Sequence, residues 1–253
     1  MTLPHPKAGR SAIQKAVIVA AGLGRRMGTA AAARPKALLE VGGTTLIERS
    51  IHSLRQASIA DITVVTGFGK ELIEDRLGNA VQYRPNPFFA MTNNMASLWF
   101  ARSAVAHEPF LYLHADIAYD REILERCLAA PASAMAVDCH PCGDEEMKVR
   151  LANGLVERSD KGIPAAEADG EWVGMACFEG ATGDALFAEI ERQLDSNGAY
   201  DAYDTHAFTQ LVQQGHRLAV VDCTGLPWVE IDFPEDLARA RQLFPTPPAG
   251  HKP

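Results

Sequence analysis

Short apolar runs alternate with amphipathic stretches through the first half of the chain. Runs with the length and near-continuous apolar character of buried strands occur at residues 15–21, 61–67, 80–84 and 109–116. Residues 44–57 predict a helix, since Thr45 and Glu48 have capping-box spacing. Its apolar residues recur at helical spacing: Leu46, Ile47, Ile51 and Leu54. Buried strands joined by helices indicate a parallel sheet covered on both faces, with ligands at the carboxyl ends of the strands.

The second half of the chain has a mixed pattern. Strands are predicted at 133–139, 147–160, 171–180, 217–223 and 228–232. Helices are predicted at about 181–195 and 202–214, and a last helix is expected to begin at Pro234. Asn153-Gly154 is a strong hairpin signal within the second strand region. We therefore expect an α/β fold with a Rossmann-like, mixed but mainly parallel sheet and helices on both faces.

Periodicity is absent at the two ends, where proline is frequent, so residues 1–13 and 245–253 are expected to be tails. Residues 14–244 are expected to form one domain, because 253 residues with 47% hydrophobic content can build one large core and no repeat is visible.

The charge of the chain limits the classes of partner that we expect. The chain has 24 Lys and Arg against 32 Asp and Glu, a formal charge of −8, which disfavours nucleic acid as a partner. A local basic cluster within residues 25–36, free of acidic residues, can still meet an anion: Arg25, Arg26, Arg34 and Lys36. No apolar run approaches the ~20 residues that span a bilayer, and the N-terminal residues lack the apolar centre of a signal peptide. We expect a cytoplasmic protein without membrane insertion.

Five cysteines, an odd number without secreted-scaffold spacing, are expected to be thiols in a reducing compartment. Cys139 and Cys142 could form half a zinc site, but no second Cys or His pair accompanies them.

A glycine-rich loop follows the first predicted strand. Gly22 and Gly24 would let backbone N–H groups approach phosphate oxygens, since glycine has no Cβ, and the basic residues that follow would supply charge. The loop matches neither the P-loop nor the dinucleotide fingerprint, because Lys36 lacks the flanking Gly and Ser or Thr and no third glycine follows. A simple tight turn is the alternative.

The full arrangement is more specific than its glycines. The strand, "AAGLGRRMG" and "RPKALLEVGGTTLIERSI" together resemble the N-terminal signature of the nucleoside triphosphate transferase family, which includes sugar-phosphate nucleotidylyltransferases and phosphocholine cytidylyltransferases. The resemblance extends from Lys15 to Phe244 and implies the fold of nucleotide-diphospho-sugar transferases. It implies that Arg25 and Lys36 contact the triphosphate, and that the loop binds base and phosphates through Ala20, Ala21, Gly22, Leu23 and Gly24.

The implied reaction is attack of a phosphate or phosphonate oxygen on the α-phosphorus of the triphosphate. Two anions must meet, so Mg²⁺ is the expected cofactor, and it needs only one or two carboxylates. Asp116 follows a buried strand, and Asp232 in "WVEIDFPEDLARA" resembles the late metal motif of the family. Glu230, on the same face of its strand as Asp232, could assist. The alternative for Asp232 is a helix N-cap before Pro234.

The acceptor is suggested by a second motif. Asn93-Asn94 alone would be a helix cap, yet "NNMASL" resembles enzymes that cytidylylate phosphocholine or 2-aminoethylphosphonate, which implies that Asn94 contacts nucleotide and acceptor. In "CHPCGDEEMKVRL", the carboxylates of Glu145 and Glu146 suit a primary ammonium, whereas an aromatic wall would suit trimethylammonium. Lys148 could place its charge on the attacking phosphonate or on the α-phosphate. The alternative is an acidic hairpin with a protective lysine.

Other polar residues could line the acceptor pocket. They are Lys161, Tyr203 and Asp204, and the last two could equally cap the helix that starts there. His114 and His206 have no assigned role. No general base is required, because the attacking oxygen is already largely ionised, and catalysis would rest on positioning and charge neutralisation.

The leading hypothesis is therefore a Mg²⁺-dependent cytidylyltransferase, with CTP assigned by resemblance alone. Its partners would be CTP and a small phosphonate or phosphate acceptor, and a homo-oligomer is compatible with the sequence. A sugar- or polyol-phosphate nucleotidylyltransferase is the second hypothesis. A catalytically silent nucleotide-binding subunit is the third, and the joint presence of Lys36, Asp116 and Asp232 argues against it.

Overall fold

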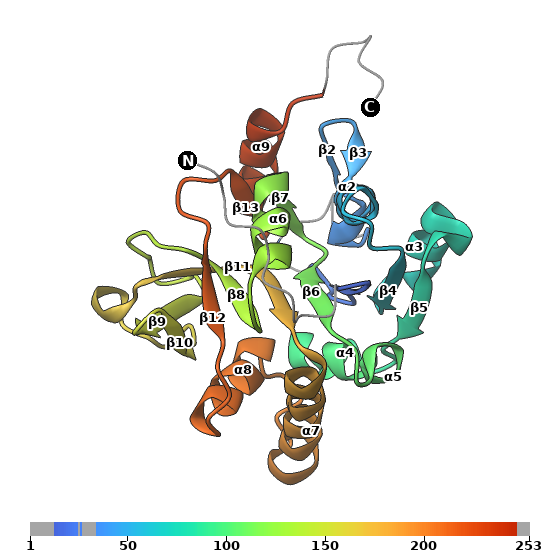
Figure 1. The fold of residues 1–253 in the computed structure, drawn as a ribbon. Coiled ribbons are helices and arrows are strands. Elements are labelled where there is room, and N and C mark those ends of the chain that lie inside the picture. Colours follow the sequence, from blue (N-terminus) through green and yellow to red (C-terminus); the bar gives the residue numbers. More distant parts are fainter. Residues whose placement is uncertain (1–12, 25, 27–33, 247–253) are drawn as a thin grey trace.

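In the computed structural model a twisted sheet runs through the middle of the molecule, with helices on both sides (Figure 1). The structure describes residues 13–24, 26 and 34–246. The main sheet contains β1 (Lys15–Ala20), β4 (Asp61–Thr66), β5 (Gln82–Pro85), β6 (Phe110–His114), β8 (Ala134–Asp138), β9 (Lys148–Ala152), β10 (Leu155–Ser159), β11 (Gly170–Phe178) and β12 (Ala219–Asp222). Two small antiparallel ladders pair β2 (Glu40–Val41) with β3 (Thr44–Thr45), and β7 (Ile117–Tyr119) with β13 (Trp228–Glu230).

Each face of the sheet has its own apolar core. One core packs the strands against α2 (Leu46–Gln56), α3 (Lys70–Leu77) and α6 (Arg121–Ala129). The other packs them against α4 (Asn94–Trp99), α5 (Arg102–Val105), α7 (Gly180–Asn197) and α8 (Asp204–Gln213). A third, smaller core joins β2, β7 and β13 to α9 (Pro234–Leu243). Short 3-10 turns complete the fold: η2 (Lys36–Leu38), η3 (Gly78–Ala80) and η4 (Ala165–Glu167).

Several local predictions are confirmed. Helix α2 carries the capping box, because the Thr45 hydroxyl accepts from the Glu48 N–H and the Glu48 carboxylate accepts from the Thr45 N–H. Asn153 and Gly154, with φ of 54° and 76°, form the turn between antiparallel β9 and β10. The last helix begins at Pro234. Ile13, expected in the tail, is buried in the core.

The mixed α/β fold is confirmed, but the sheet is less parallel than expected. Its order is β5-β4-β1-β6-β11-β8-β12-β10-β9, with parallel pairing from β5 to β6 and between β8 and β12. Strand β11 is antiparallel to both β6 and β8, and β9 pairs with both β10 and β11. The last five strands in this order, β11, β8, β12, β10 and β9, thus form a closed ring. Because β11 is almost wholly buried, its apolar pattern carries no information on strand direction.

Within the described residues, no helix has the length and apolar character needed to cross a bilayer.

Candidate active site

The glycine loop and Lys36 lie together although eleven residues separate Gly24 from Lys36. Gly24 has a φ of +59°, and a Cβ built on it would lie 3.1 Å from Lys36 Cγ, so this position requires glycine. Among the described residues, no atom lies within 4 Å of a Cβ built on Gly22, so none of them covers that backbone. Lys36 is held at the start of η2, because the next two residues, Ala37 and Leu38, are buried. The loop therefore offers bare backbone beside an ammonium group.

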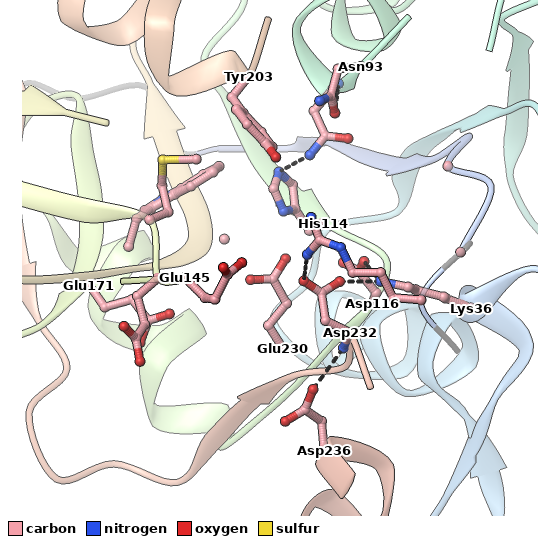
Figure 2. Close-up of a pocket in the computed structure, with 18 of the residues that line it drawn as sticks. Lys36, Asn93, His114, Asp116, Glu145, Glu171, Tyr203, Glu230, Asp232 and Asp236 are labelled. Atoms are coloured by element: carbon pink, nitrogen blue, oxygen red, sulfur yellow. Dashed lines mark hydrogen bonds and ion pairs between the residues drawn. The ribbon is translucent and has the colours of Figure 1, made fainter. Parts of the chain in front are cut away.

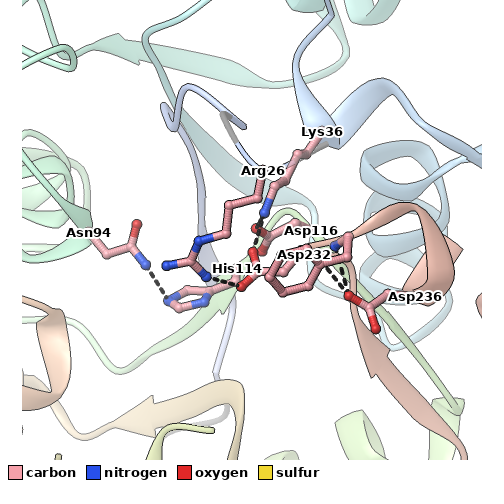
Figure 3. A network of polar contacts seen from close by, with 8 residues as sticks. Arg26, Lys36, Asn94, His114, Asp116, Asp232 and Asp236 are labelled. Atoms are coloured by element: carbon pink, nitrogen blue, oxygen red, sulfur yellow. Dashed lines mark hydrogen bonds and ion pairs between the residues drawn. The ribbon is translucent and has the colours of Figure 1, made fainter. Parts of the chain in front are cut away.

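Lys36 lies between two carboxylates (Figure 3). Its Nζ is 3.4 Å from Asp116 Oδ2 and also donates to Asp232 Oδ1, while Arg26 donates to Asp232 Oδ2 at 2.7 Å. Burial disfavours the charged Lys36, but Asp116 and Asp232 outweigh it and raise its pKa. Burial likewise opposes ionisation of Asp232, yet Lys36 and Arg26 lower its pKa. Both partners are thus charged at neutral pH.

The β7–β13 ladder brings the two aspartates together. Glu230 pairs with Ile117, and the Ile231 N–H donates to the Asp116 carbonyl at 3.0 Å. Residues 116 and 232 therefore meet at the end of the ladder where β7 begins and β13 ends. The capping alternative for Asp232 is not what the structure shows. Its backbone N–H donates to the carboxylate of Asp236, which also accepts from the Phe233 N–H, so Asp236 caps α9 and the Asp232 side chain faces Lys36.

A buried polar chain lies behind Asp116. His114 Nε2 is 2.8 Å from Asp204 Oδ2, which also accepts from the Tyr112 hydroxyl, and Asn94 Nδ2 is 3.3 Å from the same His114 nitrogen. Burial disfavours the imidazolium, but Asp204 outweighs it and raises the pKa of His114 to about 9. His114 therefore brings a buried positive charge to the floor of the site.

Asp116 and Glu230 provide hard oxygen donors for a divalent cation. His114, Asp116 and Glu230 each offer a ligand atom within 4.8 Å of one another, the one such group found among the described residues; Cys139 and Cys142 are not in it. Burial and then Asp116 raise the pKa of Glu230 to about 7. Two carboxylates that repel each other this strongly fit Mg²⁺, which prefers oxygen ligands. His114 suits the metal less well, since its Nε2 already faces Asp204.

A single large cavity joins this cluster to a second, acidic one (Figure 2). Its volume is about 1150 Å³, more than a drug-sized ligand needs, so it can hold two substrates. The glycine loop, Arg26 and Lys36 line one side, and Glu145 and Glu171 lie on the opposite side. We call the two sides the nucleotide end and the acceptor end.

The acceptor end contains an acidic group whose charges are not balanced. Asp138 and Glu171 face each other across antiparallel β8 and β11, and His140 lies 3.3 Å from Glu171. Burial and then Glu146 raise the pKa of Glu171 to about 7, although His140 opposes this. Glu146 Oε2 is buried without a hydrogen-bond partner among the described residues. A cation bound between these carboxylates would stabilise their ionised forms.

The remaining predicted residues divide into two groups. Lys161 and Tyr203 line the cavity, with Lys161 Nζ 5.5 Å from the centre of the Tyr203 ring. Asp204 is fully buried and binds Tyr112 and His114, because its side chain points beneath the cavity floor. Lys148 is also buried, and its ammonium donates to backbone carbonyls, so it does not reach a phosphonate in this arrangement. Arg25 lies outside the described residues.

Sequence reasoning gave no role to two residues that the structure places in the cavity: His114 supplies a buried charge, and Glu171 belongs to the acidic group. Arg26 was expected only as part of the basic cluster, and the structure pairs it with Asp232. His114 had a usable signal, since it stands two residues before Asp116 within the predicted strand 109–116. Glu171 had none, because only the pairing of β11 with β8 brings it to Asp138.

The fold and this two-ended cavity define a nucleotide-transferring class of α/β protein. A family model described as the MobA-like NTP transferase domain matches residues 16–211. The chain belongs to this family of NTP transferase domains, which confirms the resemblance seen in the sequence.

Similar proteins include two enzymes and a solved structure. CMP-5'-(3-aminopropyl)phosphonate synthase of Streptomyces rubellomurinus is 28% identical over 92% of this chain and 39% of its own length. The 2-aminoethylphosphonate cytidylyltransferase of Lancefieldella rimae is 34% identical, but over 42% of this chain and 44% of its own. The CTP:phosphocholine cytidylyltransferase structure from Streptococcus pneumoniae superposes with a TM-score of 0.75 at 22% identity, covering 90% of this chain and 98% of that one. The chain spans 39–52% of the length of the first three curated relatives it matches.

Proposed function

We propose that the protein is a Mg²⁺-dependent cytidylyltransferase that joins CMP from CTP to a small amino-alkyl phosphonate or phosphate, with 2-aminoethylphosphonate favoured. The observation that carries the proposal is one cavity that has cationic side chains beside bare glycine backbone at one end and carboxylates without enough cationic partners at the other. Lys36 and Arg26 suit a triphosphate at one end. Glu146 and Glu171 suit an ammonium group at the other. An acceptor with phosphonate and amine at its two ends would lie between them.

At the nucleotide end, the backbone of Gly22 to Gly24 would bind base and phosphates, while Lys36 and Arg26 would hold the phosphate oxygens. An acceptor oxygen attacks the α-phosphorus, a new P–O–P bond forms, and the α–β bridging P–O bond breaks. Pyrophosphate leaves with the electron pair of that bond, and Lys36 is placed to stabilise its charge. No proton need move, because the attacking oxygen is already ionised.

Asp116, Glu230 and Asp232 would hold the cation. Mg²⁺ supplies charge neutralisation between the two anionic substrates when bound. Asp232 is engaged with Lys36 and Arg26 in the structure, so triphosphate binding would first draw these two cations away from it.

At the acceptor end, Glu146 and Glu171 would accept N–H donors from a primary ammonium. Trimethylammonium has no such donors and favours aromatic faces. Two of the aromatic rings that line the cavity already have partners. Trp172 is 3% exposed and stacks on Tyr112, and Tyr203 faces Lys161. The names of two relatives, a CMP-5'-(3-aminopropyl)phosphonate synthase and a 2-aminoethylphosphonate cytidylyltransferase, support an amino-alkyl phosphonate acceptor and CTP.

The test is a pyrophosphate-release screen of four nucleoside triphosphates with Mg²⁺. The acceptors would be 2-aminoethylphosphonate, phosphoethanolamine, phosphocholine, a polyol phosphate and hexose phosphates. We expect CTP with 2-aminoethylphosphonate to give the highest kcat/KM, about tenfold or more above phosphocholine, because the acidic end rewards N–H donors.

The other outcomes are informative. A preference for a sugar or polyol phosphate would keep the nucleotide end and overturn the acceptor. Failure to release pyrophosphate with any pair would overturn the activity and favour a regulatory nucleotide-binding protein.

A further inference from the structure

Lys148 is a buried lysine whose charge faces only the backbone. It is 1% exposed, and its Nζ donates to the carbonyls of Asp144 at 2.9 Å, Glu146 at 3.4 Å and Lys161 at 2.9 Å. It forms no ion pair with any described residue. An ammonium has three N–H donors, so these three carbonyls satisfy it completely.

A buried charge is costly unless polar partners compensate it, so its retention needs a reason. The segments that Lys148 joins provide one. Residues 144–146 carry Glu145 and Glu146, and the turn after β10 carries Lys161, all of which line the acceptor end. The Lys148 carbonyl also accepts from the Asp160 N–H at 2.9 Å, so both its side chain and its backbone hold that turn.

The loop that Lys148 holds is packed closely against itself. A Cβ on Gly143 would lie 2.9 Å from Glu146 Oε2, so the Glu146 carboxylate folds back against its own loop. The same oxygen is buried without a hydrogen-bond partner among the described residues. A carboxylate left unsatisfied would rotate toward water if its loop could move. Rigid attachment of residues 144 and 146 therefore keeps this carboxylate folded against its loop at the wall of the cavity that Glu146 lines.

We infer that Lys148 is a positioning residue, which pre-organises the acceptor end by pinning residues 144–146 and Lys161 to one ammonium. This inference rests on the proposed function for its kinetic consequence only. The pinning itself is a property of the free protein. Lys148 then acts on acceptor affinity through Glu146, without touching either substrate.

The experiment compares Lys148→Met, which keeps length and removes the donors, with Lys148→Gln, which keeps two N–H donors without charge. We expect Lys148→Met to raise the acceptor KM about tenfold or more, with the CTP KM within about twofold of wild type. Lys148→Gln should recover part of the loss. Hydrogen exchange of residues 143–147 and 160–163 in the unliganded protein should accelerate about tenfold in Lys148→Met, with residues 34–41 unchanged.

Glu189→Gln is the matched control, since Glu189 is also buried and charged but lies on α7 outside the cavity, bound to Arg192 and Gln214. It should lower the melting temperature without changing the acceptor KM. Unchanged exchange at 143–147 and 160–163 in Lys148→Met would overturn the inference, as would equal increases of both KM values. If the wild-type protein turned over no acceptor, the proposed function would fail while the exchange result still decided the role of Lys148.

Discussion

Lys36 is shared between two carboxylates in the free protein, and a triphosphate would have to compete for it. Its ammonium contacts Asp116 and Asp232, and Arg26 neutralises the second of these. In the proposed function, nucleotide binding would exchange one set of anions around Lys36 and Arg26 for another. The acidic side chains released by this exchange are those proposed to hold Mg²⁺.

Lys36→Ala should lower kcat/KM by about two or more orders of magnitude, comparable with the loss of a strong oxyanion contact. Lys36→Arg should recover only part of the activity, because a planar fork replaces a compact charge. Lys70→Ala is the control, because Lys70 is exposed at the start of α3. Its Nζ lies 3.9 Å from Glu71 Oε1, so it forms a weak ion pair on the surface. Equal activity of Lys36→Ala and Lys70→Ala in pyrophosphate-release assays would exclude the assigned role.

Asp116→Asn should remove most turnover and leave the fold intact, because one metal ligand and its charge are lost while the side chain keeps its shape. The measurements are kcat at saturating Mg²⁺ and the circular dichroism spectrum. Near-normal kcat in a folded variant would contradict the metal assignment.

Glu171 predicts a pH dependence of acceptor binding. Its pKa is raised to about 7 by burial and by Glu146, against the effect of His140, so the carboxyl loses its charge as the pH falls through 7. The acceptor KM should therefore rise between pH 8 and pH 6, since an uncharged carboxyl holds ammonium weakly.

Glu171→Gln should remove this rise. Protonation of the acceptor phosphonate affects both proteins equally, so the difference between their KM profiles isolates Glu171. Parallel profiles would show that the ammonium is held elsewhere.

Among the elements, α2 owes part of its stability to one reciprocal cap. Thr45 and Glu48 close the capping box, and Arg76 from α3 donates to the Glu48 carboxylate at 2.8 Å and 3.0 Å. Burial opposes ionisation of Glu48, but Arg76 and Thr45 outweigh it and lower its pKa from 4.5 to about 2. Helix α2 packs in the core beneath β1, so its start is fixed close to the strand that leads into the glycine loop.

Thr45→Ala should lower the free energy of unfolding by about 1 kcal/mol, the usual cost of a lost N-cap.

The contribution of ionised Glu48 to the free energy of unfolding should be complete above its ordinary pKa of 4.5 and should disappear as the pH falls through about 2. Urea unfolding at pH 7 and pH 3 would measure it: the stability difference between wild type and Glu48→Gln should shrink at the lower pH. A constant difference would refute the ionic contribution.

Local signals predicted most elements, and long-range pairing explains most of the failures. The capping box, the Asn153-Gly154 turn and Pro234 encode structure within a few residues, so they could be read directly. Helix α3 buries only Ile73 and shows little periodicity, which is why it was not predicted. The direction of β11 depends on partners up to 68 residues away, as in the pair Phe178 and Phe110, and its apolar pattern fits either direction.

The predictions of site residues divide in the same way. Gly24, Lys36 and Asp116 could be predicted because a glycine loop and a carboxylate after a buried strand are chemically distinctive within the sequence. Lys148 could not be interpreted correctly, because sequence shows a charge beside acidic residues and not whether it faces solvent or carbonyls.

At the scale of the whole molecule, the nucleotide end is assembled from distant parts of the chain. The glycine loop follows β1, Asp116 follows β6, and Asp232 follows β13. A ligand that contacts all three should stabilise the native state as a whole.

CTP with Mg²⁺ at about 100 times its Kd should add about 2.7 kcal/mol to the free energy of unfolding. For a protein of this size, that corresponds to a rise in Tm of about 5–10 °C. Differential scanning fluorimetry would measure it without any acceptor. The shift should be largely lost in Lys36→Ala, and an undiminished shift in that variant would place the nucleotide elsewhere.

The closed ring of β11, β8, β12, β10 and β9 carries the acceptor end, whereas the glycine loop and Lys36 belong to the parallel half of the sheet. Loops that extend from a closed ring can change in length and sequence without unpairing any strand. Divergence of acceptor choice would then cost little stability, because substitutions around residues 139–147 leave Lys36 and the glycine loop, the proposed triphosphate contacts, unchanged. Grafting that segment from a relative with another acceptor is the corresponding engineering route.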